Sequence, residues 1–319
     1  MGYRKAPSIN EANLVYLVLG IILLTIGSVV QQMNLNVGLL ITEYGLILLP
    51  VILFLKYKRY SIKEFLRINL ISIKEILFIF LIIVFAYPIA VFLNFIVIEI
   101  IGYFSDATNA GVPIPLTEKD FFISLFVIGI TPGICEEVLF RGLMLNSYEK
   151  IGKMRAIIFT AVLFGLFHFN LFNFIGPTFL GVILGILYFK TDSIIASMFG
   201  HLLNNSLALT LGYFAATKLD EIEEMVTNTP SISQNQEILY TTIFLLVLSI
   251  FSSVMLISLF RHFPVKADKS EEKNIFDQLS EQPDDEVNVD HNEKINWAPI
   301  GIVVLIFIFV NTMFFMQFQ

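Results

Sequence analysis

Long apolar stretches recur along this chain and constrain its fold more than any other feature. A helix needs about 20 apolar residues to cross a bilayer, and shorter stretches can cross inside a bundle. Nine stretches fit this description: 14–33, 37–55, 75–102, 121–145, 156–169, 173–189, 193–214, 238–260 and 297–317. With 56% hydrophobic and 15% charged residues, the composition excludes a soluble domain. We predict an all-α, polytopic transmembrane helix bundle of eight or nine spans.

The spans and the polar stretches between them divide the chain into five regions. These are N-terminal transmembrane helices (1–120), core helices (121–214), an external loop with a transmembrane helix (215–263), a polar cytosolic linker (264–296) and a C-terminal transmembrane helix (297–319). The fifth span is short, so we expect protein around it. The segment 60–69 is either an amphipathic helix on the membrane surface or an ordinary basic loop.

Basic residues indicate how the bundle is oriented. With nine spans, most of them fall on one side: Arg4, Lys5, Lys56, Lys58, Arg59, Lys63, Arg67, Lys74, Lys150, Lys153, Arg155, Lys190, Arg261 and Lys266. Loops rich in lysine and arginine stay on the cytosolic side. We therefore predict an integral membrane protein with a cytosolic N-terminus. The Ile-, Phe-, Lys- and Asn-rich usage favours a bacterial cell membrane.

Four polar residues lie deep within the apolar stretches. Ionisable groups at that depth are expensive and usually functional. With a rise of about 1.5 Å per residue, Glu136 lies roughly 15 Å from the predicted cytosolic end of its span, His201 and Asn205 roughly 12 and 18 Å, and His168 roughly 18–20 Å. The predicted topology alone places all four at similar depth, so we expect them to meet.

The helical spacing of these residues predicts which faces they share. Glu137 and Arg141 are four residues apart, so they can pair, while Glu136 is rotated by about 100° and is free to point elsewhere. His201 and Asn205 are also four apart and can reach one centre. Cys135 could be considered as a thiol nucleophile, but a lone cysteine in a span usually serves packing.

This set of residues suits hydrolysis. A buried carboxylate can act as a general base, here by taking a proton from water held between Glu136 and His168. His201 and Asn205 could then donate hydrogen bonds to an oxyanion. Alternatively, Glu136, His168 and His201 could bind a catalytic zinc ion. A lone Glu–Arg pair or a lone histidine in a membrane often only joins helices, but three groups at matched depth favour a site.

Three short motifs resemble one known family. Residues 136–141 (EEVLFR) fit E-E-x-x-x-R, residues 164–168 (FGLFH) fit F-x-x-x-H, and residues 201–205 (HLLNN) fit H-x-x-x-N. In this order they resemble the CPBP family of intramembrane proteases. That family includes the CAAX prenyl proteases of the Rce type and bacterial Abi-like proteins linked to bacteriocin immunity. Gly181 and Gly185, which predict close helix packing, are also similar to the family.

The resemblance implies an endopeptidase that acts on a membrane-associated protein or peptide, with the bilayer but no nucleic acid as a further partner. It implies that Glu136 and His168 activate water, that His201 and Asn205 stabilise the oxyanion, and that Glu137 and Arg141 support the site. The cofactor stays unknown: the family is described both as metalloproteases and as metal-free glutamate proteases. We favour the metal-free form because Asn205 is a poor zinc ligand.

Two readings from other classes compete with a protease. In a transporter, Glu136, His168 and His201 would relay protons, and inverted repeats would be expected; none is visible in the sequence. In a non-catalytic immunity or scaffold protein, the motifs would serve packing, and a Glu136→Gln variant would keep its function.

Overall fold

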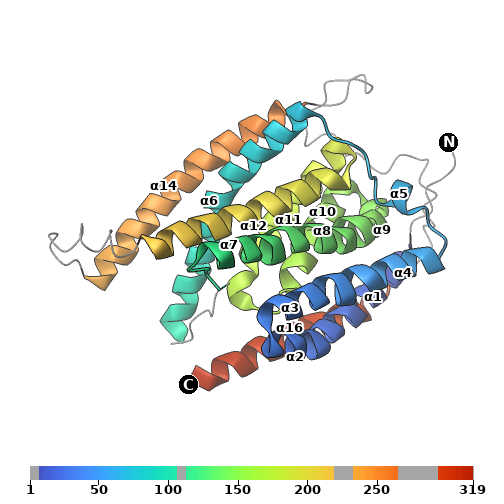
Figure 1. The fold of residues 1–319 in the computed structure, drawn as a ribbon, viewed down its shortest axis with the longest axis horizontal. Coiled ribbons are helices and arrows are strands. Elements are labelled where there is room, and N and C mark those ends of the chain that lie inside the picture. Colours follow the sequence, from blue (N-terminus) through green and yellow to red (C-terminus); the bar gives the residue numbers. More distant parts are fainter. Residues whose placement is uncertain (1–6, 106–112, 219–232, 265–293, 319) are drawn as a thin grey trace.

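The computed structural model describes residues 7–105, 113–218, 233–264 and 294–318, and every regular element in these ranges is a helix. Eight of the described helices are long and apolar enough to cross a membrane: Ile9–Met33, Leu35–Tyr57, Ile73–Phe104, Glu118–Ile151, Leu171–Thr191, Ile194–Thr217, Gln234–Arg261 and Ala298–Phe318. The predicted all-α bundle is therefore confirmed (Figure 1).

The fifth predicted span is shorter than the others. It is α10 (Lys153–Leu166), only 14 residues long, and more than half of its residues are buried. It packs against α11 (Ile175–Thr191). A Cβ atom added at Gly181 would come within 2.9 Å of Ala161 Cα, and one added at Gly185 within 3.1 Å of Ile157. The close packing predicted from these two glycines is confirmed.

Serine residues begin several of the spans. Ser8 precedes α1 (Ile9–Ile22) and Ser72 precedes α6 (Ile73–Phe104), each in a capping box with a glutamate three residues on. Ser193 caps α12 (Ile194–Thr217) by accepting from Ile195 N. These side chains satisfy backbone N–H groups that the first turn of a helix leaves free. They fix where each span starts.

Three spans switch between α-helix and π-helix along their length. The first contains η1 (Leu23–Gly27) before α2 (Ser28–Met33), and the second runs through α3 (Leu35–Leu40), η2 (Ile41–Leu48) and α4 (Leu49–Tyr57). The fourth consists of α7 (Glu118–Ser124), η3 (Leu125–Ile130), α8 (Thr131–Glu137), η4 (Val138–Leu145), α9 (Asn146–Tyr148) and η5 (Glu149–Ile151). Segments η1 to η4 are π-helical, a rare winding that often marks functional positions.

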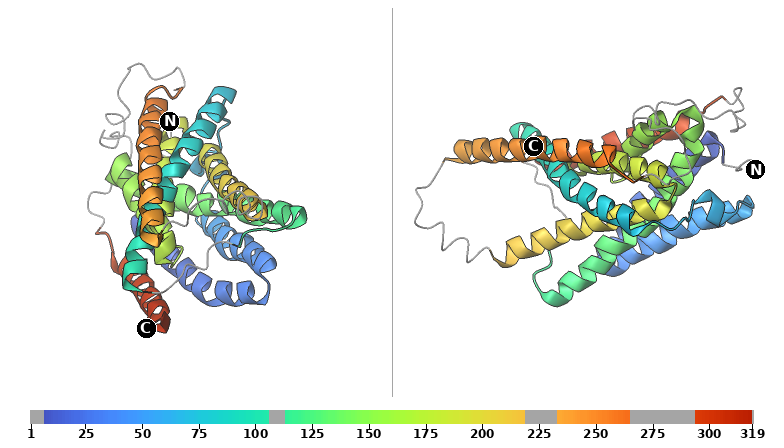
Figure 2. Two further views of the ribbon diagram at one scale, coloured as in Figure 1. Left: turned by 90° about the vertical axis from the view of Figure 1, so that its left-hand side faces the viewer. Right: turned by 90° about the horizontal axis from the view of Figure 1, so that it is seen from above.

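The helices form two flanks around a central group. On one flank, α6 runs beside α14 (Gln234–Arg261). On the other, α1 to α4 lie with α16 (Ala298–Phe315), which is followed by the short η7 (Met316–Phe318). Between them lie α8, α10, α11 and α12 (Figures 1 and 2). The central group carries all the sequence motifs.

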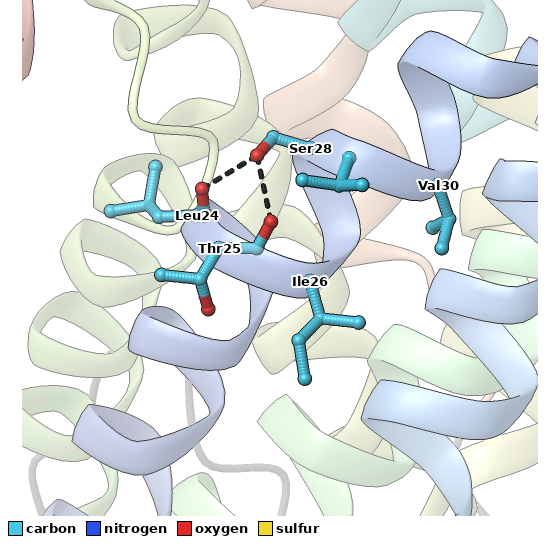
Figure 3. Close-up of a pocket in the computed structure, with 6 residues that line it drawn as sticks. Leu24, Thr25, Ile26, Ser28 and Val30 are labelled. Carbon is cyan, nitrogen blue, oxygen red and sulfur yellow. Dashed lines mark hydrogen bonds between the residues drawn. The ribbon is translucent and has the colours of Figure 1, made fainter.

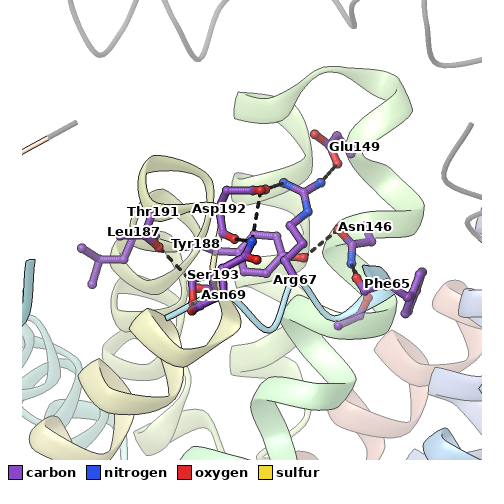
Figure 4. Close-up of polar contacts among 11 residues, drawn as sticks. Phe65, Arg67, Asn69, Asn146, Glu149, Leu187, Tyr188, Thr191, Asp192 and Ser193 are labelled. Atoms are coloured by element: carbon purple, nitrogen blue, oxygen red, sulfur yellow. Dashed lines mark hydrogen bonds and ion pairs between the residues drawn. The ribbon is translucent and has the colours of Figure 1, made fainter. Parts of the chain in front are cut away.

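Several connections meet at one end of the bundle. Arg67 pairs with Glu149 of η5 and with Asp192 between α11 and α12 (Figure 4). The first and last spans also meet at this end, where Asn296 N donates to Asn10 Oδ1 at 2.6 Å. The connections after spans two, four and six thus share one end, as alternating spans require. That this end faces the cytosol stays a prediction.

The segment 60–69 is neither a surface helix nor an open loop. It contains only the single turn α5 (Ile62–Phe65), and Phe65, Leu66 and Arg67 are buried. Asn146 donates to Phe65 O at 2.7 Å, and Ile194 N donates to Arg67 O at 3.2 Å. The segment is folded onto the helix ends because these polar contacts hold it there.

Some predictions concern residues outside the described ranges. Arg4, Lys5 and Lys266 belong to them, as do residues 219–232 of the external loop and 265–293 of the polar linker. The division into five regions stays a prediction.

Candidate active site

Close packing of α8 against α12 brings the motif residues together. A Cβ atom added at Gly133 would lie 3.2 Å from Met198 O and 3.1 Å from Leu202 N, so a larger residue at this position would push the two helices slightly apart. Glu136 and Glu137 follow one turn later on α8, and His201 lies beside Leu202 on α12. The approach at Gly133 therefore sets the distance between the glutamates and His201.

Glu137 is the centre of a buried charge cluster. Its Oε1 accepts from Arg141 Nη1 at 2.9 Å and lies 2.9 Å from His201 Nδ1. The carboxylate is fully buried, and Arg141 and His201 are each 3% exposed. The predicted Glu137–Arg141 pair is confirmed. Because a carboxylate only accepts, the contact also places a proton on His201 Nδ1.

Phe164 connects the rest of the cluster. The Arg141 guanidinium lies 5.0 Å from the centre of its ring and donates onward to Gly181 O at 3.1 Å. The rings of His168 and His201 meet Phe164 edge-on, with centroid distances of 5.3 and 5.6 Å. One aromatic ring thus contacts the arginine and both histidines. Phe164 and His168 are four residues apart, so their contact is local in sequence.

Glu136 and His168 are the accessible members of the site. The Glu136 side chain is 13% exposed, and its Oε2 lies 3.9 Å from His201 Nε2. His168 is exposed, and its Nδ1 lies 3.0 Å from Phe164 O. Since a carbonyl oxygen only accepts, this contact puts the proton on Nδ1 and leaves the lone pair on Nε2. No hydrogen bond or ion pair joins Glu136 directly to His168 in the described structure.

Asn205 lies one turn beyond His201 but is held by other partners. Its Nδ2 donates to Ile128 O at 3.1 Å, and its Oδ1 accepts from Asn204 Nδ2 at 3.1 Å. An amide carries two N–H groups, so a second donor remains on Asn205. The side chain is partly buried. The structure therefore anchors Asn205 to the π-helical segment η3 that precedes the glutamates.

The predicted zinc alternative does not fit this arrangement. Within the described residues, no three His, Cys, Asp or Glu side chains lie close enough together to hold a metal ion. Glu136 and His201 are neighbours, but His168 is not grouped with them. Cys135 is free and fully buried, which fits a packing role.

Sequence reasoning missed one ionisable residue, Glu43. It lies in η2 of the second span, is 5% exposed, and its Oε2 has no hydrogen-bond partner among the described residues. Segment η2 packs against α8, and the Glu43 carboxylate is close enough to interact electrostatically with Glu136 and Cys135. Its depth in an apolar stretch, the criterion that singled out Glu136, could have found it.

A wide depression lies away from these residues. It has a volume of about 540 Å³ and is lined by residues 24–26 and 28–30 at the end of the first span (Figure 3). Its lining is mostly apolar, and Ser28 donates its hydroxyl to Leu24 O and Thr25 O. It contains none of the motif residues and therefore plays no part in the site.

Comparison with known proteins gives the same segment a family. The fold and site define a helical membrane protein with a buried glutamate–histidine cluster. Residues 118–207 match the model of the family "Type II CAAX prenyl endopeptidase Rce1-like" and are a domain of that family. The matched segment is less than a third of the chain and holds all six predicted site residues. No curated protein and no solved structure gives a significant match.

Proposed function

We propose that this protein is an intramembrane endopeptidase that hydrolyses a peptide bond of a membrane-associated protein or peptide. The observation that supports this most is the contrast within the glutamate pair. Glu137 contacts both Arg141 and His201 through its Oε1 and is fully buried, whereas Glu136 is accessible and lies beside the Nε2 side of His201. A base must reach water, and Glu136 is placed to do so.

In the proposed reaction, water binds between Glu136 and His168. Glu136 takes a proton from the water while the water oxygen attacks the carbonyl carbon of the scissile bond. His168 orients the same water through its Nε2 lone pair. Glu136 then gives the proton to the leaving nitrogen as the C–N bond breaks, so that it ends the cycle ionised.

The developing oxyanion requires hydrogen-bond donors. His201 already has a proton on Nδ1, so its Nε2 can donate only if the ring carries both protons. Asn205 adds the N–H that Ile128 does not use. Such donors stabilise the negative charge of the tetrahedral intermediate.

The name of the family suggests a narrower substrate class, a prenylated protein with a C-terminal CAAX sequence. A substrate with a lipid anchor would approach from the bilayer, where this site lies. We therefore propose that anchored peptides near the membrane surface are cleaved, and that prenylation is the first feature to test.

The test is cleavage of membrane-anchored peptides, with and without a prenyl group, by the purified protein in liposomes. We expect Glu136→Gln to lower the cleavage rate by about 10²–10⁴-fold, because the general base is lost. Glu75→Gln is the matched control: Glu75 is a buried carboxylate that caps α6. A chelator should leave the rate unchanged, and loss that zinc restores would favour the metal form.

Two results would contradict the proposal. The first is wild-type cleavage by a correctly folded Glu136→Gln protein. The second is the absence of cleavage for every peptide together with proton-coupled transport of a solute in the same liposomes.

A further inference from the structure

The last span reaches the turn that carries His168. Asn311 lies on α16, is 8% exposed, and extends its side chain to the backbone of Phe169 and Leu171, just after His168. Leu171 N donates to Asn311 Oδ1 at 2.8 Å. Asn311 Nδ2 donates to Phe169 O at 3.3 Å and to Phe307 O of its own helix at 2.8 Å.

This turn is not a stable local structure by itself. Phe169 has a φ of +49°, a left-handed conformation that bulky residues rarely adopt. Such a conformation persists only where the surroundings hold it. The turn also lies within the bundle, where an unpartnered backbone N–H or C=O is costly. Asn311 supplies a partner for one N–H group and one C=O group of the turn.

Packing along α16 supports the same contact. The ring centroids of Trp297, just before α16, and Phe159 of α10 are 5.4 Å apart. Those of Phe307 and of Phe174, which follows the turn, are 5.7 Å apart. Helix α16 therefore lies alongside α10 from Phe159 to the turn. The contact with Asn311 is the polar end of this packing, outside the segment 118–207 that matches the family.

We propose that Asn311 is a positioning residue for His168, holding the turn of residues 168–171 so that the imidazole faces the site. This inference rests on the proposed function for its catalytic consequence. Asn311 does not touch the reacting atoms; it acts through the backbone of Phe169 and Leu171. The C-terminal span is thus part of the site's support.

The direct test is independent of catalysis. The chain has four histidines, so ¹⁵N-histidine labelling gives an NMR spectrum in which His168 is assigned by its loss in His168→Ala. We expect Asn311→Leu, which keeps the size but removes both hydrogen bonds to the turn and the one to Phe307 O, to shift the His168 imidazole signals while those of His201 stay. Ser249→Ala is the matched control, because it removes another buried interhelical bond, to Pro88 O.

A second variant approaches the contact from its other side. Leu171→Pro removes the N–H that Asn311 accepts, at the first residue of η6 (Leu171–Asn173). The preceding residue, Asn170, is extended, as the residue before a proline must be. We expect a similar shift of the His168 signals, and little additional shift when both changes are combined, because the two residues share one interaction. This variant keeps the test open if Asn311→Leu does not fold.

The kinetic result separates this inference from the proposed function. If the wild-type protein cleaves peptides, Asn311→Leu should lower kcat by about 10–100-fold, since a 1 Å displacement of a catalytic group has an effect of this size, and leave KM nearly unchanged. Unchanged His168 signals, or unchanged kcat in a cleaving enzyme, would overturn the positioning role. Shifted His168 signals in a protein that cleaves nothing would keep the structural contact and refute only the protease.

Discussion

Two buried arginines, Arg67 and Arg141, organise clusters of very different composition. Arg67, at the end of the bundle, pairs with two carboxylates and lies over two rings, those of Tyr188 and Phe189, at 4.9 and 5.4 Å. Arg141, in the middle, has one carboxylate, one carbonyl and one ring. The carboxylates around Arg67 are 22% and 49% exposed, whereas Glu137 is fully buried.

The difference separates a cluster that supports the fold, around Arg67, from one that could carry out chemistry, around Arg141. Burial alone would lower the pKa of Arg67, but Tyr188, Glu149 and Asp192 together raise it above its usual value, so this arginine stays charged. It joins three connections that are far apart in the chain (Figure 4). In the central cluster, among the described residues, Glu137 Oε2 has no hydrogen-bond partner, and Glu136 and His168 keep groups free. Unused polar groups at that depth are what a catalytic site requires.

The largest effect on stability should come from Glu137→Gln. An arginine cannot lose its proton inside a protein, so the change leaves Arg141 charged and without its direct ion pair. We expect a loss of about 3–5 kcal/mol in the free energy of unfolding, measured by denaturant titration in detergent micelles. The matched control is Glu149→Gln, the same substitution next to the other arginine, for which we expect about 1 kcal/mol or less. Equal losses in the two variants would contradict the contrast between the clusters.

A smaller effect should follow Arg67→Met. Its two carboxylate partners are partly exposed, so they can regain water when the arginine is gone, and the methionine keeps part of the contact with the two rings. We expect a loss of about 1–3 kcal/mol in the same titration. Cleavage activity per folded molecule should be unchanged. A drop in kcat at full folding would show that the end cluster also positions catalytic groups.

The smallest effect should come from Glu43→Met. The carboxyl oxygen Oε2 has no hydrogen-bond partner among the described residues, so the change removes a buried polar atom that contributes no hydrogen bond there. We expect the free energy of unfolding to stay constant or to rise by up to about 1 kcal/mol. Thermal unfolding in detergent, compared with Ser249→Ala, measures this. A clear loss of stability would mean that Glu43 makes a hydrogen bond, and Glu43 would then count as part of the site.

The predictions from sequence succeeded where the interaction is local or compositional. The apolar stretches identified the spans, because each needs only its own length and hydropathy. The four-residue spacing identified the Glu137–Arg141 pair, because neighbours on one helix face meet in any fold. Gly181 and Gly185 predicted close packing because two glycines four residues apart leave one face of the helix open to a neighbouring helix. The roles of the site residues stay predictions.

Contacts between distant parts of the chain could not be predicted in this way. Helix spacing placed His201 with Asn205, but only the packing of α8 and η3 on α12 turns the His201 Nδ1 to Glu137 and anchors Asn205 to Ile128. Segment 60–69 looked like a surface segment because its partners, Glu149 and Asp192, lie about a hundred residues away in sequence.

Hydropathy and helical spacing thus account for the bundle, its spans and the depth at which the polar residues lie. The tertiary structure alone brings His201 onto the Phe164 ring, the segment η2 that carries Glu43 onto α8, and Asn311 onto the turn after His168. The physical reason is that these contacts depend on how each helix is rotated about its axis and how closely it packs. Those quantities come from the summed fit of many side chains, which no single segment encodes.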